Sequence, residues 1–200
     1  MFTVIIPTLW KNKRIFKLID DLITSEKVGE ILIINNDKEK TPDFKSENSK
    51  LKIITPDKNI YVNPSWNLGV KNSKYDYIAL CNDDINFNSN IFSYLKPKDD
   101  SLIGLGEGCF KINFDEQYQL VENKKLTYGF GCLMFLNKQS YKMIPECLKI
   151  FCGDNFLHKN IKNVYSLRGL KVETEMSSSQ TISGYHSITQ QDKINFANLN

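Results

Sequence analysis

Long apolar runs are absent from this sequence of 200 residues, since no stretch approaches the roughly 20 residues that a membrane-spanning helix needs. The opening apolar run, Phe2–Ile6, is too short for a signal peptide, and Pro7 ends it. No glycine-rich dinucleotide fingerprint follows this run, and the sequence contains no P-loop. These absences predict a cytoplasmic protein without a membrane span, and they disfavour a dehydrogenase or an ATPase.

Cysteines are few, and the five of them form an odd set without any Cys-x-x-Cys spacing. Such a set is typical of neither a zinc site nor a disulfide framework. Cys81 and Cys132 lie in apolar, strand-like runs, which predicts buried thiols in a reducing compartment.

A large excess of charge is also lacking, because the net charge is only +3, and this value does not demand a nucleic-acid partner. The chain has 41% hydrophobic and 24% charged residues, which is the composition of an ordinary globular protein. The length suits one domain over residues 1–200. We expect a first half at 1–100, a second half at 101–176, and a polar tail at 177–200 that runs over the surface.

Strands and helices alternate in the first half of the chain. Continuous apolar runs predict four strands, at Phe2–Ile6, Glu30–Ile34, Leu51–Ile54 and Tyr77–Cys81. Helical periodicity covers residues 12–25, and Asn63-Pro64 is typical of a helix start. This alternation indicates βαβ units with a parallel sheet. After residue 100, Phe110–Phe114 and Leu126–Leu136 are strand-like. The predicted fold class is therefore α/β, with a mostly parallel central sheet flanked by helices and a smaller mixed sheet.

Polar residues follow the predicted strands at their carboxyl ends. Asn82, Asp83 and Asp84 come directly after the apolar run Tyr77–Cys81. Carboxylates at this edge of an α/β sheet lie where such folds bind ligands, and without nearby Cys or His they suit Mg²⁺ or Mn²⁺. A solvated turn is the alternative for a tripeptide of this kind. The residues expected to share one crevice with Asp84 are Pro7, Thr8, Asn35, Asn36 and Asn59.

Several segments resemble, in the right order, those of the GT-A nucleotide-sugar glycosyltransferases, family 2-like. They are the opening strand Thr3–Thr8, the second strand with its turn at Glu30–Asn36, the helix opening Asn59–Gly69, the DxD-like region Leu80–Asp84, the region around Gly131, and Gly153-Asp154 before Leu157. The tetrapeptide Asn82–Ile85 also resembles small phage and viral glycosyltransferases. The chain departs from the family pattern at Asn35 and Asn82, where Asp is usual, and at Tyr61, where Gly is usual.

The resemblance implies a GT-A fold and an inverting transfer of sugar from a nucleoside-diphosphate sugar to an acceptor hydroxyl. Mn²⁺ or Mg²⁺ at Asp84 would neutralise the charge of the leaving pyrophosphate. Asp83 is implied in donor binding, either as a direct ligand of the ion or by orienting its water ligands, and a surface carboxylate is the alternative. Asp154 is implied as the general base. The alternative for Asp154 is an ordinary acidic residue in the first turn of a helix.

The resemblance extends to residues around the donor. Asn35 or Asn36, with Pro7 and Thr8, would contact the base, and Trp10 would cover the nucleotide. Further implied positions are Asn59, Asn67 and Gly131 in donor binding, and His186 as a third metal ligand from the tail. For each of the donor-binding residues, the alternative is a purely structural role. For His186, the alternative is a surface position without a metal.

The acceptor stays open at this stage. A glycan and a hydroxymethylated base of viral DNA are both compatible with the sequence, and a viral chain would act in the host cytoplasm. A catalytically inactive nucleotide-sugar-binding protein is a further alternative.

Overall fold

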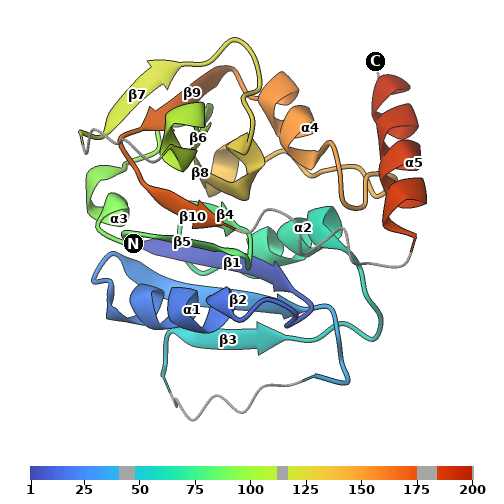
Figure 1. The fold of residues 1–200 in the computed structure, drawn as a ribbon, viewed down its shortest axis with the longest axis horizontal. Helices are drawn as coiled ribbons and strands as arrows, with labels where there is room; N and C mark the ends of the chain where they lie inside the picture. Colours follow the sequence, from blue (N-terminus) through green and yellow to red (C-terminus); the bar gives the residue numbers. More distant parts are fainter. Residues whose placement is uncertain (41–47, 112–116, 175–183, 200) are drawn as a thin grey trace.

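A single eight-stranded sheet runs through the computed structural model, which describes residues 1–40, 48–111, 117–174 and 184–199 (Figure 1). Its strand order is β3-β2-β1-β4-β8-β6-β9-β7. The strands are β1 Phe2–Thr8, β2 Val28–Asn35, β3 Leu51–Ile54, β4 Tyr77–Cys81, β6 Ser101–Leu105, β7 Gln119–Glu122, β8 Leu133–Asn137 and β9 Asn163–Arg168.

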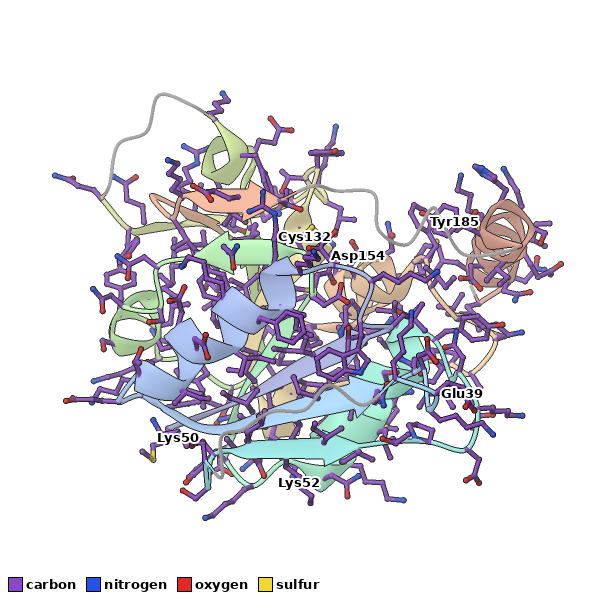
Figure 2. The ribbon with its side chains drawn as sticks, turned by 60° about the horizontal axis from the view of Figure 1, so that its bottom comes forward. Glu39, Lys50, Lys52, Cys132, Asp154 and Tyr185 are labelled. Atoms are coloured by element: carbon purple, nitrogen blue, oxygen red, sulfur yellow. The ribbon has the colours of Figure 1, made fainter. Side chains whose placement is uncertain are left out.

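The first half of the sheet is parallel, as predicted. Strand β1 lies between β2 and β4 and pairs in parallel with both, while β3 continues the parallel order beyond β2. All seven residues of β1 are buried, because helices cover both faces of this part of the sheet. At the edge, β3 carries the exposed Lys52 (Figure 2), a charge of the kind that protects edge strands from further pairing.

The second half extends the same sheet. Strand β8 pairs antiparallel with both β4 and β6, so the later strands continue directly from the parallel half. The separate small sheet consists of two antiparallel strands, β5 Ile85–Phe87 and β10 Val172–Thr174. The α/β class with a large, mostly parallel sheet and a small second sheet is thus confirmed, and the small sheet is antiparallel.

Two strand predictions in the second half need correction. In Leu126–Leu136, only the end is extended, because Gly129 adopts a left-handed conformation and the 3₁₀ turn η2, Phe130–Cys132, precedes β8. In Phe110–Phe114, the first residue ends the 3₁₀ turn η1, Glu107–Phe110, and residues 112–114 lie outside the described part of the chain.

Helices form the outer layers. They are α1 Arg14–Thr24, α2 Val62–Asn72, α3 Ile91–Tyr94, α4 Gly153–Asn160 and α5 Tyr185–Ala197, with a further 3₁₀ turn η3 at Lys138–Ser140. Apolar residues of α1 and α3 pack with the small sheet on one face of the main sheet, whereas those of α2 and α4 pack on the other. Helix α2 starts one residue before the predicted Asn63, so this asparagine lies inside the helix.

The C-terminal segment differs most from expectation. The sequence predicts a polar tail over the surface, but residues 185–197 form α5, which stands at the side of the molecule in Figure 1. Cys81 and Cys132 are buried, in agreement with the prediction for their thiols. Among the described residues, no helix is both long and apolar enough to span a lipid bilayer.

Candidate active site

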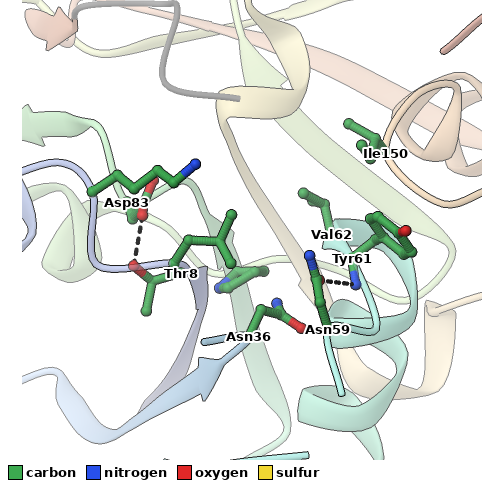
Figure 3. A pocket seen from close by; sticks show the side chains of 10 residues that line it. Thr8, Asn36, Asn59, Tyr61, Val62, Asp83 and Ile150 are labelled. Atoms are coloured by element: carbon green, nitrogen blue, oxygen red, sulfur yellow. Dashed lines mark hydrogen bonds between the residues drawn. The ribbon is translucent and has the colours of Figure 1, made fainter. Parts of the chain in front are cut away.

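The carboxyl ends of β1 and β4 border a pocket (Figure 3). Because the two strands are parallel neighbours, Thr8 at the end of β1 lies close to Asp83, just beyond β4. The pocket is lined by Pro7, Thr8, Leu9, Lys11, Asn36, Asn59, Tyr61, Val62, Asp83 and Ile150. Five of the residues expected to bind the donor therefore line this pocket, namely Pro7, Thr8, Asn36, Asn59 and Asp83.

Asp83 is held by β1. The Thr8 hydroxyl donates a hydrogen bond of 2.6 Å to Oδ2 of Asp83, and the backbone N–H of Trp10 donates to the Thr8 hydroxyl at 2.8 Å. Burial raises the pKa of Asp83 to about 6, and the neighbouring charge of Asp84 adds to the rise, while the Thr8 hydrogen bond opposes it. Asp83 therefore presents to the pocket a carboxylate that takes up a proton more readily than an exposed aspartate does.

Asp84 lies deeper than Asp83, with 6% of its surface exposed. Burial is the main cause that raises the pKa of Cys132 to about 12, and the charges of Asp84 and Asp154 raise it further. Both carboxylates thus act on the same thiol from different elements. Figure 2 shows Cys132 next to Asp154.

Asp154 lies in the first turn of α4, as predicted, and its Oδ1 accepts a hydrogen bond of 2.9 Å from the N–H of Asn155. Burial raises its pKa, whereas this hydrogen bond and the nearby His158 lower it. The backbone of Gly131 comes so close that a Cβ there would lie 2.8 Å from Oδ2 of Asp154. A raised pKa and a fixed position suit a proton acceptor.

Asn35 and Trp10 hold each other. The indole N–H of Trp10 donates to Oδ1 of Asn35 at 2.9 Å, and Asn35 is fully buried. The amide group of Asn35 donates to the carbonyl of Lys40. Neither residue lines the pocket. In this arrangement they join the chain beyond β1 to the end of β2, and their contacts with the nucleotide stay a prediction.

Asn36 and Asn59 make structural hydrogen bonds and also line the pocket. Asn36 donates to Ser65 of α2 and accepts from the N–H of Ile60, while Asn59 accepts from the N–H of Tyr61. They shape the chain before α2 and also face the pocket.

Asn67 is hydrogen-bonded to the segment 141–144, and its role in donor binding stays a prediction. Its Nδ2 donates to the carbonyl of Ile144, and its Oδ1 accepts from the Tyr141 hydroxyl and the Ile144 N–H. These contacts use the amide oxygen and one N–H of the amide to attach α2 to residues 141–144, and Asn67 is not among the residues that line the pocket.

His186 is exposed on α5, where its ring lies against Tyr185. Within the described residues, no group of three or more His, Cys, Asp and Glu side chains could hold a metal ion. The role of His186 as a ligand stays a prediction. Glu107, an acidic residue at the start of η1, is exposed.

Sequence reasoning missed the pocket wall formed by Tyr61, Val62 and Ile150. Tyr61 carried a signal, because it stands where the related pattern has Gly, and its φ of 68° is one that glycine favours. Ile150 carried none, since its position depends on contacts with segments distant in the sequence.

No protein-family model and no curated protein matches the sequence. Solved structures do share the fold. S. aureus TarS 1–349 in complex with UDP-GlcNAc matches with TM-score 0.64 and 15% identity, over 94% of this chain and 64% of that one. GalNAc-T7 with UDP, GalNAc and Mn²⁺ matches with TM-score 0.60 and 11% identity, over 87% of this chain and 43% of that one. S. aureus TarS matches with TM-score 0.60 and 14% identity, over 98% of this chain and 40% of that one.

These comparisons show the fold, which is the GT-A type expected from the sequence. Identities of 11 to 15% for these three structures carry no residue roles by themselves. The chain spans between 40% and 64% of the length of those proteins.

Proposed function

We propose that this chain is a metal-dependent, inverting glycosyltransferase that moves a sugar from a nucleoside-diphosphate sugar to an acceptor hydroxyl. One observation carries the proposal. Asp83, just beyond β4, lines the pocket, while its neighbour Asp84 and Asp154 at the start of α4 both act on the Cys132 thiol, in a fold shared with structures that hold UDP or UDP-GlcNAc.

A divalent cation fits the carboxylates at the end of β4. Asp83 and Asp84 are adjacent and little exposed, and the charge of Asp84 raises the pKa of Asp83. A bound cation would relieve that repulsion. Mg²⁺-type ions are commonly held by one or two carboxylates together with substrate phosphates, so a site with few protein ligands is sufficient. When bound, the ion would neutralise charge on the leaving diphosphate.

The chain's own residues supply the remaining functions. Thr8 orients Asp83, and Asn36, Asn59 and Tyr61 form the wall that would face the nucleoside. Asp154 would take the proton of the acceptor hydroxyl, because its raised pKa makes it a stronger base than an exposed aspartate. A single displacement with the base opposite the leaving group inverts the anomeric carbon.

The test is a screen of nucleotide sugars by calorimetry and by donor hydrolysis, with Mn²⁺, Mg²⁺ or EDTA present. Uridine diphosphate sugars come first because the TarS and GalNAc-T7 structures contain UDP. We expect binding and slow hydrolysis that EDTA abolishes and Mn²⁺ restores. The variant Asp84→Asn should lose metal-dependent binding, and Asp99→Asn, at an exposed position, is the matched control.

Two results would contradict the proposal. Full activity in EDTA would show that catalysis needs no divalent cation. Binding of a donor without hydrolysis or transfer under any condition would indicate a nucleotide-sugar-binding protein without catalysis.

A further inference from the structure

The turn formed by residues 149–151 connects the pocket to the candidate base. Ile150 lines the pocket (Figure 3), and three residues later α4 begins at Gly153. Between them, Cys152 has a φ of 60°, a left-handed conformation that changes the chain direction. The position of this turn therefore determines where both Ile150 and Asp154 lie.

Helix α2 holds the carbonyl side of the turn through one buried residue. The N–H of Asn63 donates to the carbonyl of Lys149 at 2.9 Å, and its Nδ2 donates to the carbonyl of Phe151 at 3.1 Å. Asn63 also lies against the start of α4, where a Cβ on Gly153 would come within 2.1 Å of its side-chain oxygen.

Helix α5 holds the N–H side of the same turn through Asp192. Oδ1 accepts from the N–H of Lys149 at 3.0 Å, and Oδ2 accepts from the N–H groups of Ile150 and Phe151, each at 2.8 Å. Only 1% of the Asp192 surface is exposed. Hydrogen bonds from N–H groups to a carboxylate are stronger than neutral ones, and a buried carboxylate requires such partners.

Other contacts of α5 with this region involve groups outside the N–H side of the turn. Nδ2 of the half-buried Asn195 donates to the carbonyl of Cys147 at 2.7 Å, and the Lys193 ammonium lies 5.3 Å from the centre of the Phe151 ring. They dock the helix but do not engage the N–H groups of residues 149–151. Asp192 is thus the one described contact that spans the whole turn from this side.

We propose that Asp192 is a positioning residue of the active site, which fixes the turn at 149–151 and through it the pocket wall at Ile150 and the base Asp154. This inference rests on the proposed function, because that function gives Ile150 and Asp154 their roles. It assigns the C-terminal helix to the catalytic apparatus, although α5 contributes no residue to the pocket lining.

Replacement of Asp192 by Asn tests the role with little change in shape. In either orientation, the Asn amide presents an NH₂ group where one carboxylate oxygen accepts, so at least one of the three N–H groups loses its acceptor. Displacement of a catalytic group by about 1 Å can cost on the order of 100-fold in rate. We expect kcat for donor hydrolysis or transfer to fall about tenfold or more at saturating donor.

Amide exchange measured by NMR follows the turn without any need for activity. In the wild type, the N–H groups of residues 149–151 should be protected, as should that of Asn155, which is bound to Asp154. Asp192→Asn should accelerate exchange at all four about tenfold or more. Asn195→Ala is the matched control, since it removes a docking contact of α5 and leaves the turn untouched, so kcat and exchange at 149–151 should stay within twofold.

The outcomes separate this inference from the proposed function. If the wild type binds or hydrolyses no nucleotide sugar, the proposed function fails, and the exchange data still show whether Asp192 controls the turn and the Asp154 contact. Unprotected N–H groups at 149–151 in the wild type would overturn the inference even if Asp192→Asn fails to fold. So would a folded Asp192→Asn variant with kcat and exchange within twofold of wild type.

Discussion

Gly131 and Asp154 are in contact across the site, and the contact depends on the absence of a side chain at residue 131. A Cβ at this position would lie 2.8 Å from Oδ2 and 2.9 Å from Cβ of Asp154. The first distance involves an atom that can move, but the second involves one that is fixed close to the backbone of α4. Residue 131 therefore limits where the carboxylate of Asp154 can lie.

The variant Gly131→Ala should displace Asp154 and reduce turnover. We expect kcat to fall by about 10- to 100-fold, because the base leaves its position by a fraction of an ångström or more. The free energy of unfolding should drop by about 1 to 3 kcal/mol from overpacking. Gly108→Ala is the matched control, since nothing lies within 4 Å of a Cβ at Gly108. Wild-type kcat in Gly131→Ala would show that Asp154 is not held by this contact.

Asp83 should destabilise the folded chain at neutral pH. Its pKa is about 6 in the folded protein, above the usual value of 3.8, so the folded chain keeps the proton that the unfolded chain loses between pH 4 and pH 6. The free energy of unfolding should therefore decrease as the pH rises through this window. Asp83→Asn should raise it by about 1 to 3 kcal/mol at pH 7.5 and leave it nearly unchanged at pH 3.5.

Chemical denaturation at the two pH values measures this difference, with Asp99→Asn as the exposed control. The same Asp83→Asn variant should bind donor less tightly in Mn²⁺, because the neutral amide is a poorer ligand for a hard cation. A loss of stability at pH 7.5 would mean that the charged form is favoured in the fold, against the stated direction.

Tyr61 should show strain that is separable from its contact with the pocket. Its φ of 68° and ψ of −175° lie in a region that is nearly restricted to glycine, at a cost of about 1 to 3 kcal/mol. Tyr61→Gly and Tyr61→Ala both remove the ring, and both should weaken donor binding because the ring lines the pocket. The Gly variant should nevertheless be the more stable by about 1 kcal/mol or more, as measured by thermal unfolding.

This order is diagnostic because Gly is the less stable of the two at unstrained positions, by about 0.5 to 1 kcal/mol. Equal stabilities, or a more stable Ala variant, would show that the backbone at residue 61 relaxes to an ordinary conformation.

The sequence was sufficient where burial on both faces of a sheet imposes a continuous apolar run. The strand predicted at Tyr77–Cys81 has those bounds in the structure, and the β1 and β2 cores were located in the same way. The site followed from this, since parallel strands end at a common edge, which brought Thr8 and Asp83 together.

The rest depended on contacts that no local pattern encodes. Helix α5 lacks an apolar stripe and is held by Asp192 and Asn195, whose partners lie more than 40 positions earlier in the chain. In the same way, Asn67 reads as a donor contact by motif, but its amide is used by Tyr141 and Ile144, which are 74 and 77 positions away. Hydrogen-bond partners at such separation are set by tertiary packing.

The base is tested by Asp154→Asn, which keeps the shape of the side chain and removes its basicity. General-base catalysis typically contributes about 10²- to 10⁴-fold, so the transfer rate should fall within that range. Donor affinity measured by calorimetry should stay nearly unchanged, because the donor is assigned to the pocket and to the carboxylates at the end of β4. Because burial raises the pKa of Asp154, wild-type kcat should rise with pH through a value above the usual 3.8, and the variant should lose that dependence. Transfer at a near wild-type rate would reduce Asp154 to a helix-terminal acid, with Glu107 or the acceptor itself as the base to examine next.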